Sequence, residues 1–305
     1  MSKTIFEKLP VRYNHLLCEE DYIKVLELVQ DFLENYGNIE NISDGVIFFD
    51  DNSHEHHQIP MDNLIRTLSG ENLYSWEKHI EEHFEKLLNK PELQYNLWDF
   101  DSIKHMLSLR VYPDGYFESV DFQGKIIYTV DFELTKTTLV FDFPEKFTPV
   151  ESKYFKKWGL EKEKVFEVAQ KNINKQKVTI DKKSYPEGFE LYTFFSGDYS
   201  VSYLRDFEKN AGFAKGNYGS LVMIPTRGSG FVHPINGREI SLVIGEIHNM
   251  IFNFYEEDPG PINANYYWYF NNRFTMFPIS IDKDGYTNYF LPKELHAMIM
   301  KKVEG

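Results

Sequence analysis

The chain has 305 residues, a length just above that at which one hydrophobic core usually divides, so one large domain or two smaller ones are both open. Its 47 acidic and 33 basic residues give a formal net charge of −14. This balance repels phosphate groups and argues against nucleic acids and anionic membranes as partners, whereas it favours a basic protein partner or a cationic ligand.

Cysteine content and apolar runs indicate the cellular compartment. Cys18 is the only cysteine, which excludes a disulfide within the chain and a cysteine-based structural zinc site. Residues 1–12 lack the apolar core of a signal peptide, and no apolar run approaches the length of a membrane-spanning helix. We therefore expect a cytoplasmic protein without a membrane partner.

The first hundred residues predict a mostly helical region. Apolar residues recur at helical spacing over residues 20–36, 60–68 and 72–89. A short strand is expected at residues 45–49, with a polar loop over residues 50–58. The turn-rich stretch at residues 90–105 is the best boundary. We predict a helical N-terminal region over residues 1–100 and a second domain over residues 101–305.

In the second domain, helical segments alternate with pairs of strands. The expected strands are residues 107–111, 126–133, 137–143, 177–180, 189–195, 219–225, 231–235 and 266–274, the last including a hairpin turn. The expected helices are residues 151–158, 161–174, 199–210, 241–257 and 293–303. Hairpins between helices pair antiparallel. The sequence therefore predicts an α+β fold, with an antiparallel or mixed sheet of helix-strand-strand units packed against helices.

One candidate metal site lies in a predicted helix. Residues 79–83 read His-Ile-Glu-Glu-His, which fits the H-x-x-E-H pattern of inverted zinc proteases. On a helix His79 and His83 share a face and can bind one zinc ion, while Glu82 activates a water molecule. Because five positions match easily by chance and His83 falls in the apolar stripe of the helix, a core histidine bonded to a neighbour is the favoured interpretation.

A second candidate metal site is the polar loop after the first strand. It holds His54, His56 and His57 close to three carboxylates. Imidazole and carboxylate groups at this density can chelate zinc or nickel. Adjacent side chains in a loop rarely converge without a rigid frame, so a polar loop without a metal is the favoured interpretation.

Two further polar groups have simpler structural interpretations. Residues 226–230 read Thr-Arg-Gly-Ser-Gly, but a phosphate-binding loop leads into a helix, and this segment joins two strands. It therefore predicts a hairpin turn. Asp198, Arg205, Asp206 and Glu208 could form a polar site, but a helix cap and a solvated helix face are favoured.

An ordered series of short motifs resembles a known group of proteins. The series is Asp142-Phe143-Pro144, Trp158-Gly159, Gly197-Asp198-Tyr199, Gly219-Ser220-Leu221-Val222, His233-Pro234 and residues 255–262. Over residues 76–277 this order resembles uncharacterised bacterial proteins that include the YtpQ-like family. The resemblance implies a bacterial cytosolic α+β protein. It implies no site residues, because no activity or catalytic residue is known for that group.

Three functions from different classes remain open. The charge, the lack of a catalytic pattern and the resemblance favour a non-enzymatic protein-binding or regulatory protein, of the immunity or defence-accessory type. The first alternative is a metal-dependent hydrolase with zinc as cofactor, which uses either His79, Glu82 and His83 or the histidine-rich loop. The second is a small-molecule sensor with a pocket between sheet and helices.

Overall fold

The computed structural model of the chain describes residues 7–52, 56–88, 95–117, 125–144, 146–258, 260–277, 279–281 and 287–301. The chain forms two compact units, one of Met1–Pro91 with Glu256–Gly260, the other of Glu92–Tyr255 with Pro261–Gly305. The strand pairs within the sheets are antiparallel, and helices pack on them, so the predicted α+β fold is confirmed. No helix within the described ranges is both long enough and apolar enough to cross a membrane.

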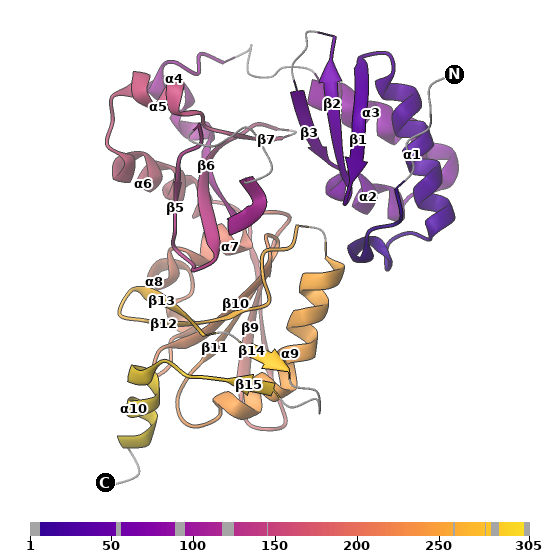
Figure 1. Cartoon of the computed structure of the whole chain (residues 1–305). Coiled ribbons are helices and arrows are strands. Elements are labelled where there is room, and N and C mark those ends of the chain that lie inside the picture. Colours follow the sequence, from indigo (N-terminus) through magenta and orange to yellow (C-terminus); the bar gives the residue numbers. More distant parts are fainter. Residues whose placement is uncertain are drawn as a thin grey trace. The chain divides into compact units, whose positions relative to one another are not determined.

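The N-terminal unit packs three helices around a three-stranded antiparallel sheet (Figure 1). Its elements are α1 (Glu19–Leu33), β1 (Gly37–Ser43), β2 (Val46–Asp51), β3 (His56–Pro60), α2 (Asp62–Ser69) and α3 (Trp76–Leu88). Asp44 and Gly45 join β1 to β2 with φ of 49° and 68°, the backbone that an Asp-Gly hairpin turn requires. The prediction of a polar loop over residues 50–58 is wrong at both ends. Residues 50–51 belong to β2, and residues 56–58 belong to β3.

The C-terminal unit contains two main antiparallel sheets. The larger has the order β13-β12-β10-β11-β9-β8, with β8 (Thr179–Ser184), β9 (Glu190–Phe195), β10 (Ser220–Thr226), β11 (Ser229–Pro234), β12 (Tyr266–Phe270) and β13 (Arg273–Phe277). The smaller has the order β4-β6-β5, with β4 (Leu107–Pro113), β5 (Tyr128–Thr129), β6 (Thr135–Asp142) and β7 (Phe147–Pro149), which also pairs with β6. A separate hairpin joins β14 (Ile279–Ile281) to β15 (Thr287–Tyr289).

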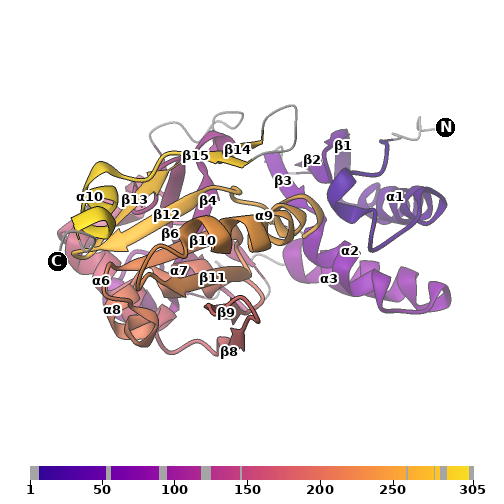
Figure 2. The same cartoon turned by 90° about the horizontal axis from the view of Figure 1, so that it is seen from below.

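Helices cover these sheets. They are α4 (Phe100–Ile103), α5 (Ser152–Trp158), α6 (Lys162–Ile173), α7 (Ser200–Leu204), α8 (Phe207–Asn210), α9 (Ile240–Glu257) and α10 (Lys293–Lys301). Short 3-10 helices lie at Val11–Tyr13, Leu73–Ser75, Lys104–Met106, Asp114–Phe117 and Gly212–Ala214. Figure 2 shows α9 alongside the larger sheet.

Strands β10, β11 and β12 of the larger sheet are buried on both faces, which explains their nearly continuous apolar sequences. Successive residues of a strand point to opposite faces. Leu221 and Trp268 therefore pack in the core beneath α9 and α10, whereas Val222 and Tyr267 pack with α7 and α8. The predicted series of hairpin, helix and hairpin over residues 219–274 is confirmed by β10–β11, α9 and β12–β13.

The smaller sheet positions α6. Leu107, Leu139 and Phe141 of this sheet share a core with Val165 and Ala169 of α6. One side of α6 is thereby held against β4 and β6, and its remaining side is left for other contacts.

Candidate functional site

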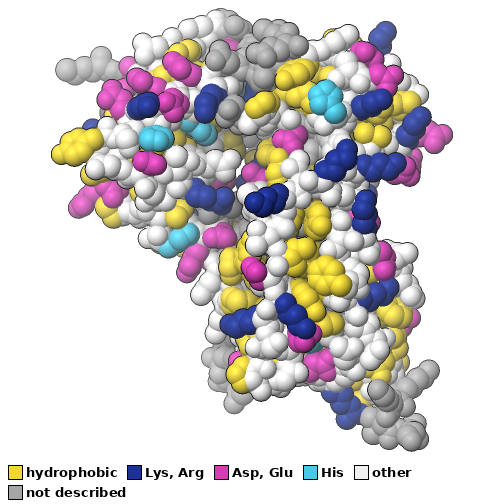
Figure 3. All heavy atoms as spheres, turned by 180° about the vertical axis from the view of Figure 1, so that it is seen from behind, with side chains coloured by type: hydrophobic (Ala, Val, Ile, Leu, Met, Phe, Trp, Pro, Cys, Tyr) yellow, Lys and Arg dark blue, Asp and Glu magenta, His cyan; other side chains and the backbone are white. Residues whose placement is uncertain are grey.

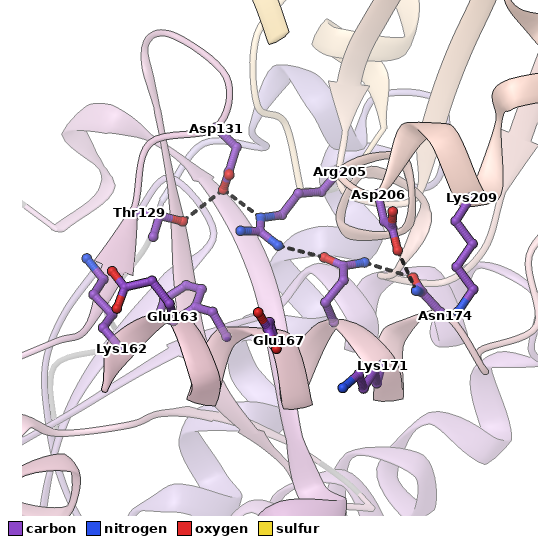
Figure 4. Close-up of a pocket in the computed structure, with 12 residues that line it drawn as sticks. Thr129, Asp131, Lys162, Glu163, Glu167, Lys171, Asn174, Arg205, Asp206 and Lys209 are labelled. Atoms are coloured by element: carbon purple, nitrogen blue, oxygen red, sulfur yellow. Dashed lines mark hydrogen bonds and ion pairs between the residues drawn. The ribbon is translucent and has the colours of Figure 1, made fainter. Parts of the chain in front are cut away.

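A cleft of about 520 Å³ opens beside α6 in the C-terminal unit (Figure 4). This volume falls in the range of small-molecule sites. Three segments line it: β5 and the residues after it, α6, and the α7–α8 junction. The lining residues are Thr129, Asp131, Lys162, Glu163, Phe166, Glu167, Gln170, Lys171, Asn174, Arg205, Asp206 and Lys209.

Helix α6 contributes two rows of side chains to the cleft. Residues four apart lie on the same side of a helix. The first row is Lys162, Phe166 and Gln170, and the second is Glu163, Glu167 and Lys171. Because Val165, Ala169 and Ile173 fix the other side of the helix in the core, these rows have a defined orientation.

A chain of polar contacts forms the floor of the cleft. Arg205 Nε lies 2.8 Å from Asp131 Oδ2 in an ion pair, and Arg205 Nη1 donates to Gln170 Oε1 at 3.0 Å. Gln170 Nε2 donates to Asn174 Oδ1 at 2.9 Å, and Asn174 Nδ2 donates to Asp206 Oδ2 at 2.7 Å. The dashed lines in Figure 4 follow this series. Such a connected network fixes the orientation of each member.

The network depends on a break that the sequence does not reveal. The single helix predicted over residues 199–210 is wrong: the chain leaves helical geometry at Asp206, with φ of −90° and ψ of 63°, between α7 and α8. The break directs Arg205 and Asp206 toward α6. Asn210 Nδ2 donates to Asn174 Oδ1 at 2.8 Å and ties α8 to the same network.

The rim of the cleft carries charged side chains that are not engaged in ion pairs or hydrogen bonds with described residues. Lys162, Glu163, Glu167, Lys171 and Lys209 form no side-chain ion pair or hydrogen bond with another residue in the described part of the chain. Lys162 Nζ lies over the rings of Tyr128 and Phe166, 5.9 and 5.6 Å from their centroids. The floor is thus internally bonded, and the charges of the rim are available to a ligand.

Charge in the cleft is balanced, unlike the charge of the chain. Four acidic and four basic side chains line it: Asp131, Glu163, Glu167 and Asp206 against Lys162, Lys171, Arg205 and Lys209. The whole chain carries −14. On the face drawn in Figure 3, acidic and basic side chains are interspersed rather than separated by sign. A ligand of the cleft therefore meets both signs of charge.

The predicted zinc helix is α3, and its residues are only partly brought together. His79 Nδ1 donates to the Ser75 carbonyl at 2.8 Å, and Glu82 Oε1 lies 3.6 Å from Lys78 Nζ on the exposed side. His83 packs edge-on against Phe84, with a buried Nε2 that has no hydrogen-bond partner among the described residues. His83 is half-buried beside the core residues of α3, and the expected hydrogen bond at its Nε2 is not made with a described residue.

The histidine-rich segment is described in part. His54 lies outside the described residues, and His56 is placed only as backbone in β3. His57 Nε2 lies 3.2 Å from Asp51 Oδ2 across the β2–β3 pair. No group of three or more His, Cys, Asp or Glu side chains within the described ranges is arranged to hold a metal ion. The zinc hypothesis stays a prediction.

The polar residues around Asp198 separate into three places. Arg205 and Asp206 line the cleft. Asp198 Oδ1 accepts from Arg227 Nε at 3.3 Å, and Arg227 belongs to the β10–β11 turn, which confirms a hairpin for residues 226–230. Glu208 pairs with Lys215. The interpretation of these residues as a helix cap and a solvated helix face did not predict the cleft. In the sequence, the cleft is indicated only by Gln170 and Asn174, two polar residues four positions apart.

Comparisons with known proteins give no information on the cleft. No protein-family model, no curated protein and no solved structure matches this chain. The resemblance to the YtpQ-like group is therefore carried only by the motifs in the sequence.

Proposed function

We propose that the protein is a non-enzymatic binding protein that holds a small hydrophilic molecule in the cleft beside α6. One observation carries this proposal: a bonded polar floor lies under a rim of charged side chains that form no ion pair or hydrogen bond with a described residue. Prearranged polar groups lower the cost of ordering when a ligand binds. This is the sensor alternative of the sequence analysis, with a pocket between helices and a sheet.

The floor carboxylates support the proposal through the side chains that they hold in place. Asp131 Oδ2 accepts from Thr129 Oγ1 at 2.8 Å and lies beside Arg205, while Asp206 accepts from Asn174. Charge-assisted bonds of this kind hold both carboxylates and their donors in fixed positions. Their role in the proposal is to orient Arg205 and Asn174.

The charge and the motif series support the wider setting of the proposal. We infer a bacterial cytoplasmic regulatory protein of the YtpQ-like group that transmits occupancy of the cleft to a basic protein partner. A net charge of −14 favours a partner of opposite sign. We expect the affinity for this partner to fall steeply as the salt concentration rises. We also expect the affinity to differ between the free and the ligand-bound protein.

Thermal unfolding of the full chain against a library of polar metabolites tests the binding site. A ligand at a hundred times its Kd stabilises the folded state by about 2.7 kcal/mol, which raises Tm by about 5 °C. Lys171→Ala should reduce this rise. Lys164→Ala is the matched control, because Lys164 is exposed on α6 outside the cleft. If no compound raises Tm, or both variants respond equally, the cleft is not the binding site.

A further inference from the structure

The cleft also restricts the class of its ligand, an inference that rests on the binding function proposed above. We propose that the ligand is a zwitterion of the amino-acid type, with its carboxylate bound at Arg205 and its ammonium group at Glu163 and Glu167. Three features of the cleft lead to this class: the orientation of one guanidinium group, the placement of two carboxylates, and the balance of charge.

Arg205 offers one fixed edge to an anion. Its Nε lies beside Asp131 and its Nη1 donates to Gln170. Its Nη2 makes no hydrogen bond with a residue in the described ranges, and its Cζ lies over the ring of Phe166 on α6, 5.9 Å from the centroid. A guanidinium group held on two sides presents its remaining N–H groups in one direction, which suits a carboxylate.

Two carboxylates of α6 offer the complementary site. Glu163 and Glu167 are one turn apart in the row that faces the cleft, and both side chains are exposed. Neither forms an ion pair with a described residue, so their charge is not compensated within the fold. An ammonium group between them and Arg205 would satisfy both carboxylates while its own carboxylate meets the guanidinium group.

The charge balance of the cleft disfavours ligands of a single sign. A phosphate ester would approach Arg205 past Glu163 and Glu167, whose charges oppose it. A polyamine would meet Lys162, Lys171 and Lys209. A small ligand with one positive and one negative group is attracted by both the acidic and the basic side chains of the cleft. It is not strongly repelled by either group of side chains.

The far end of the cleft indicates a polar side chain on the ligand. Asn174, Asp206 and Lys209 gather there in Figure 4, away from Glu163. Phe166 is the only aromatic or aliphatic side chain of the described lining, and it is 3% exposed. Amino acids with amide, hydroxyl or charged side chains should therefore bind better than leucine or phenylalanine.

The experiment compares matched probes on the full chain by thermal shift and calorimetry. The probes are serine, asparagine, glutamine and glutamate, with ethanolamine as the amine lacking a carboxylate, glycerate as the acid lacking an ammonium group, and inorganic phosphate. At least one amino acid should bind, and ethanolamine, glycerate and phosphate should each bind at least tenfold more weakly than that amino acid. Arg205→Lys and Glu167→Gln should each weaken that binding at least tenfold.

Controls separate the possible failures. Glu167→Gln still tests the proposal if Arg205→Lys fails to fold. Glu167 is exposed and forms no ion pair with a described residue, so its substitution should leave the fold intact. Lys164→Ala and Glu246→Gln, both at exposed helix positions, should leave binding unchanged. Equal binding of glycerate or phosphate would overturn the zwitterion while leaving a binding cleft. Failure of all amino acids, when another library compound binds in the cleft, would overturn it too. If no compound of the library binds, the proposed binding function itself is contradicted.

Discussion

Arg110 and Asp198 are 88 residues apart in the sequence and form an ion pair, with 2.6 Å between Nη2 and Oδ1. Arg227 Nε lies 3.3 Å from the same oxygen, and the three side chains are 11–16% exposed. One carboxylate therefore connects β4, the segment before α7 and the β10–β11 turn.

The first prediction is that Asp198→Asn destabilises the C-terminal unit by about 2–4 kcal/mol. The substitution removes the charge that two mostly buried guanidinium groups share, and a broken buried pair costs more than an intact pair contributes. Denaturant unfolding followed by tryptophan fluorescence measures the change. Asp181→Asn on the exposed strand β8 is the control and should change stability by less than about 0.5 kcal/mol. Equal values for the two variants would show that the carboxylate does not hold the three segments together.

Two turn signals show how far the fold could be predicted from sequence. Asn271-Asn272 is flanked by aromatic strands, and the hairpin was predicted correctly. Asp44-Gly45 is an equally strong turn, but the strand before it, Gly37–Ser43, buries only Ile42. Without an alternating apolar pattern β1 could not be recognised, and β3 was taken for a loop because its histidines are polar. Strands with a strong apolar pattern were predictable, and strands at the margin of a core were not.

The cleft was less predictable than the fold. Arg205 follows α7 and Asp131 follows β5, and their pairing depends on how α7 packs against the smaller sheet, which local patterns do not encode. The break at Asp206 was hidden because the residues around it have ordinary helix-forming character. The remaining signal was Gln170, a polar residue on a helix whose neighbours are buried, and 7% exposed itself. A buried glutamine requires hydrogen-bond partners, so it indicates a network without naming its members.

The second prediction compares two glycines. Gly219 has φ of +86°, and a Cβ at this position would lie 2.2 Å from the Tyr269 carbonyl oxygen. Gly219→Ala should therefore destabilise by about 3 kcal/mol, because both the backbone and the β10–β12 pairing must shift. Gly245 lies at an exposed position inside α9, and a Cβ there meets no atom within 4 Å. Gly245→Ala should stabilise by about 0.5–1 kcal/mol. Chemical denaturation measures both, and a loss of stability in Gly245→Ala would contradict the helix geometry.

The third prediction concerns acid sensitivity at Glu239. Burial alone would raise its pKa, but His233 at 3.6 Å and the backbone N–H groups of Asn236 and Gly237, at 2.7 and 3.0 Å, lower the pKa to about 2. Since the pKa of glutamate in the unfolded chain is 4.5, the stabilisation is complete above pH 4.5 and is lost as the pH falls toward 2. It amounts to at most about 3 kcal/mol.

Glu239→Gln should remove this dependence. The variant should be less stable than the wild type at pH 7, and the difference should shrink as the pH falls from 4.5 toward 2. Urea unfolding at several pH values measures it. Glu246→Gln, exposed on α9, is the control and should follow the wild type. A difference that stays constant with pH would mean that the hydrogen bonds of Glu239 do not act through its charge.

The fourth prediction concerns His83, for which burial, with a smaller effect of Lys86, lowers the pKa to about 4. Below pH 6.5 His83 is protonated in the unfolded chain but stays neutral in the folded chain. The free energy of unfolding therefore falls between pH 6.5 and 4, by at most about 3 kcal/mol. His83→Leu should remove this loss, because it replaces an unpaired buried nitrogen with an apolar group beside Phe84. His105→Leu, at an exposed position, should retain it. Unfolding at pH 7.5 and pH 5 gives both slopes, and equal slopes for the two variants would contradict a neutral buried His83.

The fifth prediction separates a core histidine from the zinc hydrolase hypothesis. His83 Nε2 is buried, so this nitrogen can reach a metal ion only if α3 leaves its core position. Stoichiometric zinc should therefore leave Tm unchanged in the wild type, in His79→Ala and in His105→Ala alike. A zinc-dependent rise in Tm that disappears in His79→Ala and persists in His105→Ala would establish a metal site on α3. Glu82→Gln would then distinguish the roles, because an acid–base residue can be lost without loss of zinc, whereas a ligand cannot.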